Sequence, residues 1–315
     1  MSAQPTECPT LHESSAVMLL AYGTPDSMED VEAYFTHIRG GRRPSPESVE
    51  NLRERYRSIG GTTPLTRITN LTARELALEL GRRGTPMRVF IGMKHWHPYI
   101  ADAVRSMCEQ NIDDVVALVL APHYSRMSVG GYRKAFEEAS RDLPMATTFI
   151  EQWHTHPGFI EFIEQRVRDA IRGFHDDKRE DVAIVFSAHS LPEKIRTWND
   201  PYESQLLESC QLVADRLGLE KWNFAWQSAG NTGEPWIGPD ICDFLQELRV
   251  AGVKNVLSVP IGFVSDHLEV LYDIDREAKQ KASELGMHLR RIEMPNADPA
   301  FIRVLADIVT DARRP

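Results

Sequence analysis

Residues 255–277 form the stretch NVLSVPIGFVSDHLEVLYDIDRE, which indicates how the rest of the chain folds. Its first five residues are an apolar, partly β-branched run that favours a strand, and the later apolar residues recur at helical spacing. Between the two parts, Pro260 and Gly262 favour a sharp loop. The stretch therefore predicts a strand, a loop and a helix in direct succession, which is the unit from which parallel α/β sheets are built.

Three carboxylates follow one another along the predicted helix. Glu269, Asp273 and Glu277 are spaced four residues apart, so they share one helix face. Like charges on one face repel each other, and a solvated face normally has Lys or Arg among them. The spacing fits two interpretations, a solvated acidic face and an unpaired acidic track for a divalent cation.

The alternation of short apolar runs with longer amphipathic segments extends over almost the whole chain. Strands are predicted at residues 17–21, 87–92, 115–121, 146–150, 182–188, 224–227, 253–259 and 289–292. Eight strands with some long connections favour an α/β fold with two four-stranded parallel sheets over a single barrel. We expect a loose tail at residues 1–15, an N-terminal domain at 16–150 and a C-terminal domain at 151–297. A three-helix insertion is expected at residues 27–84, and a C-terminal helix at 298–312 is expected to join the first domain.

Composition limits the classes of function. The chain has 36 Lys and Arg against 46 Asp and Glu, and the formal charge of −10 argues against general binding to nucleic acid or anionic membranes. Its cysteines, Cys8, Cys108, Cys210 and Cys242, form no C-x-x-C pair, which favours reduced thiols in a cytosolic protein. The N-terminus lacks the pattern of a signal peptide, and no apolar run approaches the roughly 18 residues of a spanning helix. We therefore expect a cytoplasmic protein without stable membrane insertion.

Two predicted strands end in similar segments. The first ends in AYGTP (21–25) and the fifth in AHSLP (188–192), so Tyr22 and His189 occupy equivalent positions. Because open α/β sheets bind ligands at the carboxyl ends of their strands, both side chains are expected to face one cleft. A neutral imidazole binds borderline metals and accepts protons near neutral pH. The alternative is a chance similarity of short segments, with His189 a simple hydrogen-bonding residue of a loop.

The inserted segment is rich in arginine, which recognises carboxylates in a bidentate manner. Its arginines between residues 39 and 57 are Arg39, Arg42, Arg43, Arg53, Arg55 and Arg57. Pairing with nearby glutamates is the simpler interpretation of Arg53 and Arg57. The histidine pairs 95/97 and 154/156 have no third ligand nearby in the sequence, which favours loop histidines over a metal site. The turn after the first strand lacks the G-x-G-x-x-G motif, which argues against NAD.

Seven segments of the chain resemble the ferrochelatases and occur in the order found in that family. They are AYGTP (21–25), IGGTTPL (59–65), LAPHYS (120–125), SAHSLPEKI (187–195), DPY (200–202), WQSAGNTGEPWIGPD (226–240) and GFVSDHLEVLYD (262–273). The resemblance extends from about residue 16 to PNADP (295–299). It implies insertion of Fe(II) into a porphyrin, in a cleft between two similar Rossmann-like domains, each with a four-stranded parallel sheet flanked by helices.

The resemblance also implies roles for individual side chains. His189 and Glu269 match the metal-site residues, and Tyr22 matches a tyrosine on the opposite porphyrin face that can be the axial ligand of product iron. Asp273 and Glu277 match an outer acidic path for metal or protons. Matches to positions that contact the macrocycle or its propionates are Arg39, Arg55, Tyr56, Thr63 and Tyr132. Gly40 stands where some relatives have a second Arg, and Thr63 where some have Ser, so propionate contacts are expected to be rearranged.

The segment at 226–240 and the small insertion are closer to the coproporphyrin-dependent bacterial branch of the family. This likeness implies a cytoplasmic monomer that converts coproporphyrin III and Fe(II) into coprohaem. Its partners would be porphyrin and ferrous iron, with transient contacts to other enzymes of haem synthesis. Fe(II) would be a substrate, and no cofactor would be permanently bound. Some relatives bind a [2Fe-2S] cluster through C-terminal cysteines, but no Cys follows Cys242, so no iron–sulfur cluster is expected.

Three other functions fit the same residues. A protoporphyrin IX ferrochelatase differs from the main prediction in the number of substrate propionates. A non-catalytic carrier of haem or another tetrapyrrole would bind without turnover. A cobalt or nickel chelatase acting on sirohydrochlorin would bind eight carboxylates, and the modest number of pocket arginines argues against that substrate.

Overall fold

The structure is a computed structural model that describes residues 14–174, 182–230 and 232–314, and its strands form two separate parallel sheets. The first sheet contains β1 (Ser15–Ala21), β2 (Arg88–Met93), β3 (Asp114–Val119) and β4 (Ala146–Ile150). The second contains β5 (Val182–His189), β6 (Asn223–Gln227), β7 (Asn255–Val259) and β8 (His288–Arg291). The predicted fold class is confirmed. Ser15 already belongs to β1, so the predicted tail ends before it, and residues 1–13 lie outside the described part.

The two sheets have the same topology. Their strand orders are β2-β1-β3-β4 and β6-β5-β7-β8, and every neighbouring pair is parallel. β1 and β7 are buried at every residue, as expected for parallel strands covered by helices on both faces. β1 and β5 occupy equivalent places, which confirms the symmetry predicted from their terminal segments. The carboxyl ends of these strands carry Tyr22 and His189.

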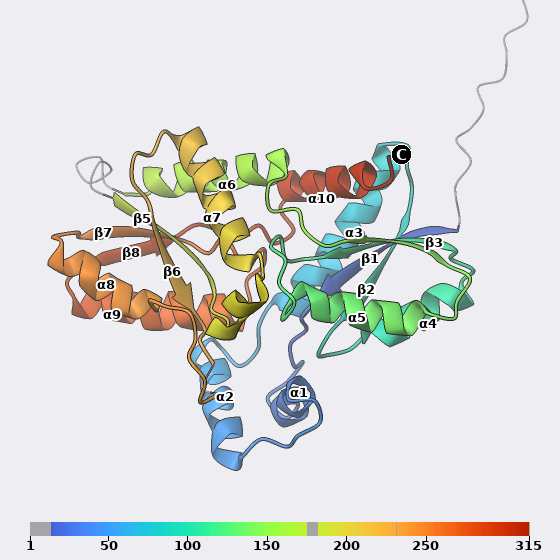
Figure 1. Cartoon of the computed structure of the whole chain (residues 1–315), viewed down its shortest axis with the longest axis horizontal. Coiled ribbons are helices and arrows are strands. Elements are labelled where there is room, and N and C mark those ends of the chain that lie inside the picture. The colour runs from blue at the N-terminus through green and yellow to red at the C-terminus, as the bar shows by residue number, and fades with distance from the viewer. Residues whose placement is uncertain (1–13, 175–181, 231, 315) are drawn as a thin grey trace, which may run out of the picture.

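The segment between β1 and β2 forms the three predicted helices, α1 (Val31–Ile38), α2 (Pro46–Ser58) and α3 (Leu65–Arg82). α2 begins where the sequence supplies a helix start, because Ser45 Oγ accepts a hydrogen bond from the Ser48 amide at 3.2 Å and Pro46 occupies the first turn. α3 packs against β2, whereas α1 and α2 lie on the side of the molecule opposite α10 (Pro299–Asp311) (Figure 1).

The other helical elements connect successive strands. They are α4 (Ile100–Glu109), α5 (Val129–Ser140), α6 (Pro157–Arg172), the 3₁₀ segment η2 (Glu193–Trp198), α7 (Tyr202–Leu217), α8 (Ile241–Val250), the π-helical segment η3 (Val270–Ala278) and α9 (Lys279–Glu284). Among the described helices, none combines the length and apolar character needed to cross a membrane. The strand–loop–helix unit predicted at 255–277 is present as β7 and η3, but η3 has the wider turn of a π-helix.

One continuous core links the two halves. Leu19 of β1, Phe186 of β5 and Leu305 of α10 are fully buried members of the same apolar cluster. α10 packs against α3 of the first half and α6 of the second, and Figure 1 shows it between them. The predicted C-terminal helix therefore joins both halves, while the exact domain limits at residues 150 and 297 stay predictions.

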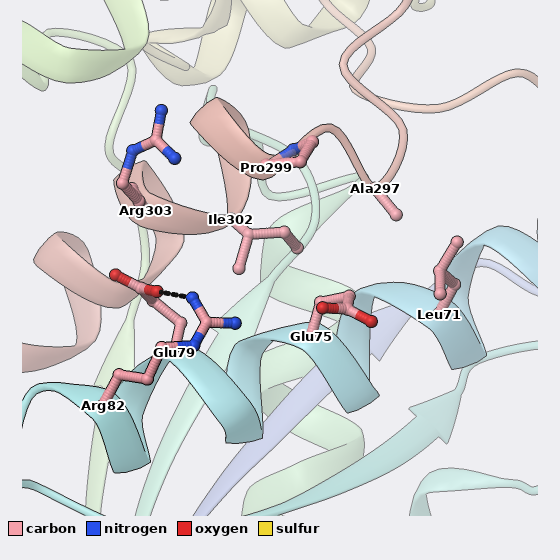
Figure 2. Close-up of a pocket in the computed structure, with 8 residues that line it drawn as sticks. All are labelled: Leu71, Glu75, Glu79, Arg82, Ala297, Pro299, Ile302 and Arg303. Atoms are coloured by element: carbon pink, nitrogen blue, oxygen red, sulfur yellow. Dashed lines mark hydrogen bonds and ion pairs between the residues drawn. The ribbon is translucent and has the colours of Figure 1, made fainter.

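A pocket lies between α3 and α10 (Figure 2), and none of the predicted site residues lines it. It is lined by Leu71, Glu75, Glu79, Arg82, Ala297, Pro299, Ile302 and Arg303. Its central carboxylate, Glu79, pairs with Arg82 and with Arg83, and Arg83 reaches Asp307 of α10 at 2.6 Å. These side chains pair with one another, and the ion pair between Arg83 and Asp307 links the end of α3 to α10.

Candidate active site

His189 is the last residue of β5 and is held at the carboxyl edge of the second sheet. Its Nδ1 contacts the carbonyl of Ser190, and its own carbonyl accepts a hydrogen bond of 3.1 Å from the Tyr202 hydroxyl. Because a carbonyl can only accept, Nδ1 carries a proton. Nε2 is then the atom available for chemistry, and it lies 3.4 Å from Oε1 of Glu269.

Glu269 precedes η3 and lies between two imidazoles. Its Oε1 is 3.4 Å from Nε2 of His189, and its Oε2 is 3.4 Å from Nε2 of His267. The Gln227 side chain at the end of β6 donates a 2.9 Å hydrogen bond to the Glu269 carbonyl. Sequence reasoning missed His267, although its position two residues before Glu269 in the segment DHLE was an available signal. Among the described residues, no group of three or more His, Cys, Asp or Glu could hold a metal ion as they stand.

The charges of His189 and Glu269 stabilise each other. Burial is the largest single influence and disfavours the imidazolium, but the charge and hydrogen bond of Glu269, the Ser190 carbonyl and the charge of Asp273 together outweigh it and raise the pKa of His189 to about 9. Burial also disfavours the carboxylate, but His189 and then His267 outweigh it and hold the pKa of Glu269 well below its usual range. Both side chains are about one-third exposed, so the pair can meet a ligand from solution.

Asp273 is the most buried of the three predicted carboxylates, with 5% of its surface exposed. Ser228 Oγ donates to its Oδ2, and Arg55 of α2 lies 3.8 Å from its Oδ1. Burial and then the charge of Glu269 raise the pKa of Asp273 to about 7. Ser228 has a φ of +62°, which is strained for a residue with a side chain, and strained residues cluster at functional sites. Glu269 and Asp273 both have partners, so these two carboxylates are not unpaired, and the burial of Asp273 does not fit a fully solvated acidic face.

The three carboxylates differ in their burial. Glu269 is half-buried against the two histidines, Asp273 is buried, and Glu277 is exposed. Four residues are close to one turn of a π-helix as well as of an α-helix, so the three positions stay on one side of η3. The series therefore begins at His189 and ends in solvent.

Tyr22 lies at the end of β1, equivalent to the position of His189. Its side chain is 41% exposed, and its ring lies 4.6 Å from the ring of His95, which follows β2. Although the residue is partly exposed, desolvation by the surrounding protein and then the charge of Glu269 raise the pKa of Tyr22, so Glu269 acts on the opposite strand end. Burial, followed by Lys94 and His37, lowers the pKa of His95 to about 3, which keeps this imidazole neutral.

The residues predicted to contact the macrocycle differ in how deeply they are buried. Tyr56 is 1% exposed, and its hydroxyl lies 3.2 Å from Oγ1 of Thr24. Thr63 is half-buried and donates a 3.0 Å hydrogen bond to the same Thr24 oxygen. Tyr56 and Thr63 therefore both contact the Thr24 side chain. Tyr132 of α5 is also largely buried, at 6% exposure, and the substrate contacts of Tyr56 and Tyr132 stay predictions.

The arginines of the inserted segment differ in their partners. Arg53 and Arg57 pair with Glu50 of the same helix, at 3.9 Å and 2.7 Å, as the simpler interpretation predicted. Arg39 is exposed after α1, with its guanidinium 5.8 Å from the Phe35 ring. Arg55 reaches from α2 to η3, where it meets Asp273 and lies 4.9 Å from the Tyr272 ring. Arg55 thus connects the inserted helices to the second half of the molecule.

Comparison with solved structures identifies the class of fold. SirB from Bacillus subtilis with Fe³⁺ matches with a TM-score of 0.61 and 10% identity, over 95% of each chain. CbiX, described as the terminal enzyme for biosynthesis of siroheme in denitrifying bacteria, matches with a TM-score of 0.55 and 12% identity, over 95% of this chain and 100% of that chain. At such low identities these matches define the two-domain chelatase fold and nothing finer.

Sequence comparison then gives the family. The ferrochelatase family model matches residues 14–313, and the chain belongs to this family. It is 47% identical to a ferrochelatase of Herpetosiphon aurantiacus, over 94% of this chain and 98% of the relative. It is 43% identical to the coproporphyrin III ferrochelatase of Bacillus subtilis, over 93% and 96% of the two chains. The resemblance found in the seven sequence segments is confirmed.

Proposed function

We propose that this protein is a coproporphyrin III ferrochelatase, which inserts Fe(II) into coproporphyrin III and yields coprohaem. The observation that carries the proposal is the pairing of His189 with Glu269 at one strand end while Tyr22 occupies the equivalent end of the other sheet. Relatives named coproporphyrin III ferrochelatase, at 43–45% identity over more than nine-tenths of the chain, support this substrate.

The reaction exchanges two pyrrole N–H protons for one divalent ion. An imidazole binds a metal in its neutral form, so Fe(II) must displace the proton that Glu269 stabilises on His189. We assign His189 Nε2 and the Glu269 carboxylate as the metal ligands and first proton acceptors. Two protein ligands leave further positions on the ion to water and porphyrin nitrogens. His189 supplies an imidazole nitrogen and Glu269 supplies carboxylate oxygens. These donors hold iron less tightly than a set of thiolates would, which suits release of iron into the porphyrin.

Asp273 and Glu277 would form the outer part of the path. A carboxyl with a pKa of about 7 exchanges protons readily near neutral pH, and Asp273 is buried between Glu269 and the exposed Glu277. Protons released at the porphyrin would pass outward through this series. Fe(II) could enter by the same series of oxygen ligands.

The first half of the molecule would hold the porphyrin. Tyr22, opposite Glu269, is assigned as the axial ligand of product iron. Coproporphyrin III has four propionates and protoporphyrin IX has two, so the former needs more cationic or hydrogen-bonding partners. The residues assigned to carboxylates or the macrocycle edge are Arg39, Arg55, Thr63 and Tyr132. The exposed guanidiniums of Arg39 and Arg55 are the strongest of these candidates.

Removal of the imidazole tests the proposal directly. His189→Ala is expected to lower iron insertion to background while porphyrin binding, measured by fluorescence quenching, stays within about threefold, because the lost group acts on the metal. His288→Ala, at the exposed start of β8, is the matched control and is expected to keep full activity. Turnover near the wild-type level in His189→Ala would refute the assigned metal site.

Steady-state rates with both porphyrins test the substrate. A clear preference for protoporphyrin IX would replace the proposed substrate by that alternative, which the relative named simply ferrochelatase also allows. Tight porphyrin binding without insertion of either Fe(II) or Zn(II) would instead indicate a carrier.

We further propose a cytoplasmic monomer with no permanently bound cofactor. The three cysteines that the structure describes are free, and none follows Cys242 in the sequence. Stoichiometric acid-labile sulfide in the purified protein would contradict the absence of an iron–sulfur cluster. Sedimentation and cell fractionation test the oligomeric state and the location.

A further inference from the structure

Lys94 is a half-buried cation that forms no ion pair within the described parts of the chain. It follows β2 directly, and its backbone amide donates a 2.9 Å hydrogen bond to the carbonyl of Ala21 at the end of β1. Lys94 thus lies at the same sheet edge as Tyr22. Burial lowers the pKa of its ammonium, which means that the charged form lacks a compensating partner.

The ammonium lies against an aromatic ring and the start of a helix. Nζ lies 4.9 Å from the centre of the Tyr132 ring, and a Cβ on Gly131 would come within 2.4 Å of Nζ. Gly131 belongs to the first turn of α5, so the positive end of that helix adds to the charge of Lys94. A cation–π contact offsets only a small part of the cost of burying an ammonium.

Three other lysines of the described chain have anionic neighbours. Lys134 of α5 lies 3.9 Å from Glu138, Lys194 lies 2.8 Å from Glu234, and Lys279 lies 2.7 Å from Asp275. Lys94 differs because its nearest partners are an aromatic face and a helix start. An incoming carboxylate would supply the missing charge.

We propose that Lys94 is a specificity-determining residue that binds a propionate present in coproporphyrin III but absent from protoporphyrin IX. This inference rests on the proposed function and extends it to a residue that neither spacing nor motif singled out. A third cation beside Arg39 and Arg55 fits a substrate with four carboxylates better than one with two.

Substitution at Lys94 separates binding of the extra carboxylate from packing. Lys94→Met keeps the length and apolar stem and removes the charge. Its KM for coproporphyrin III is expected to rise about tenfold, as for the loss of one hydrogen bond to a charged group, while KM for protoporphyrin IX changes less than about twofold. Lys94→Arg is expected to retain most of the preference, and Lys134→Met on the exposed face of α5 is the control.

Equal changes in KM for both porphyrins, or no change for either, would overturn the inference. Fluorescence quenching without metal measures the same selectivity independently of turnover. Loss of coproporphyrin affinity in Lys94→Met would therefore support the role of Lys94 even if the wild-type protein failed to insert iron, which would contradict only the proposed function. If Lys94→Met does not fold, Lys94→Gln provides the same comparison.

Discussion

The ends of β1 and β5 occupy equivalent places in two sheets of identical topology, yet their chemistry is opposite. The β5 end gathers the carboxylates Glu269 and Asp273 around His189. The β1 end presents Tyr22, which stays protonated, beside the neutral imidazole of His95 and the ammonium of Lys94. The same sheet topology therefore has two different chemical environments. The β5 end is anionic and suits a metal ion and protons, whereas the β1 end is neutral to cationic and suits a ligand with carboxylates.

Most of the difference arises outside the two strands. β1 is buried throughout and β5 over its middle residues, and apart from Tyr22 and His189 the contrasting side chains come from the loops and helices that follow the neighbouring strands. Loops of this kind can change without disturbing the core. The comparison therefore predicts that substitutions on the β5 side impair the chemical step, whereas substitutions on the β1 side alter binding or product properties.

The largest contrast is expected within the acidic series. Glu269→Gln should lower turnover at least about 100-fold, because it removes a metal ligand and proton acceptor beside His189. Glu277→Gln should lower turnover less than about fivefold, because exposed positions can be replaced by solvent. Steady-state iron insertion measures both. Equal losses would argue against a path that runs from an inner to an outer carboxylate.

Substitution of Asp273 is expected to lower the rate less than Glu269→Gln does, and to change how the rate depends on pH. Because its pKa is raised to about 7, the carboxyl is mostly protonated below that pH and accepts protons above it. The rate should therefore rise with pH through about 7 in the wild-type protein. Asp273→Asn should lower the rate about tenfold and remove the step near pH 7, leaving the rise toward pH 9 that accompanies loss of the His189 proton. A pH–rate profile from 5.5 to 8.5 measures this difference. If the step near pH 7 were unchanged in Asp273→Asn, the step would belong to another titrating group.

The smallest effect on rate is expected on the β1 side. Tyr22→Phe removes one hydroxyl and keeps the ring against His95, so turnover should stay within about threefold of the wild type. The absorption spectrum of bound product should change, since the proposed axial ligand is lost. A large loss of turnover with an unchanged product spectrum would instead move Tyr22 into the chemical step and weaken the contrast between the two sides.

Several features could be predicted from the sequence because they depend on local patterns. Apolar runs located all eight strands, and the signal is clearest for β1, β3 and β7, because strands covered by helices on both faces need continuous apolar side chains. The Ala–ring–Pro segments indicated that Tyr22 and His189 end equivalent strands. Four-residue spacing placed Glu269 and Asp273 on one side of a helix even though that helix proved to be a π-helix.

Other features depend on residues far apart in the sequence. Spacing gave no sign that Ser228 would donate to Asp273 across 45 residues, or that Arg55 would reach Asp273 from an inserted helix. Spacing also gave no sign that the Tyr56 hydroxyl would meet Thr24 across 32 residues. These arrangements follow from the way in which the two halves and the insertion pack.

The junction between the halves is a further example. The LAPHYS segment after β3 contacts α7 and the loop before it, with His123 Nε2 lying 2.9 Å from Ser209 Oγ and the Tyr124 amide donating to Gln205 at 2.7 Å. Ser125 donates to Asp200 at 3.1 Å. The sequence showed LAPHYS and DPY only as separate motifs.

The sequence by itself determined the two parallel sheets, the family and the pair of strand ends that carry Tyr22 and His189, because apolar periodicity and short motifs are local properties. The tertiary structure alone decided which charges meet. It placed His267 against Glu269, buried Asp273, and left Lys94 without an anionic neighbour. Burial and charge separation depend on every element packed around a group, and they decide how readily that group takes up a proton, a metal ion or a carboxylate.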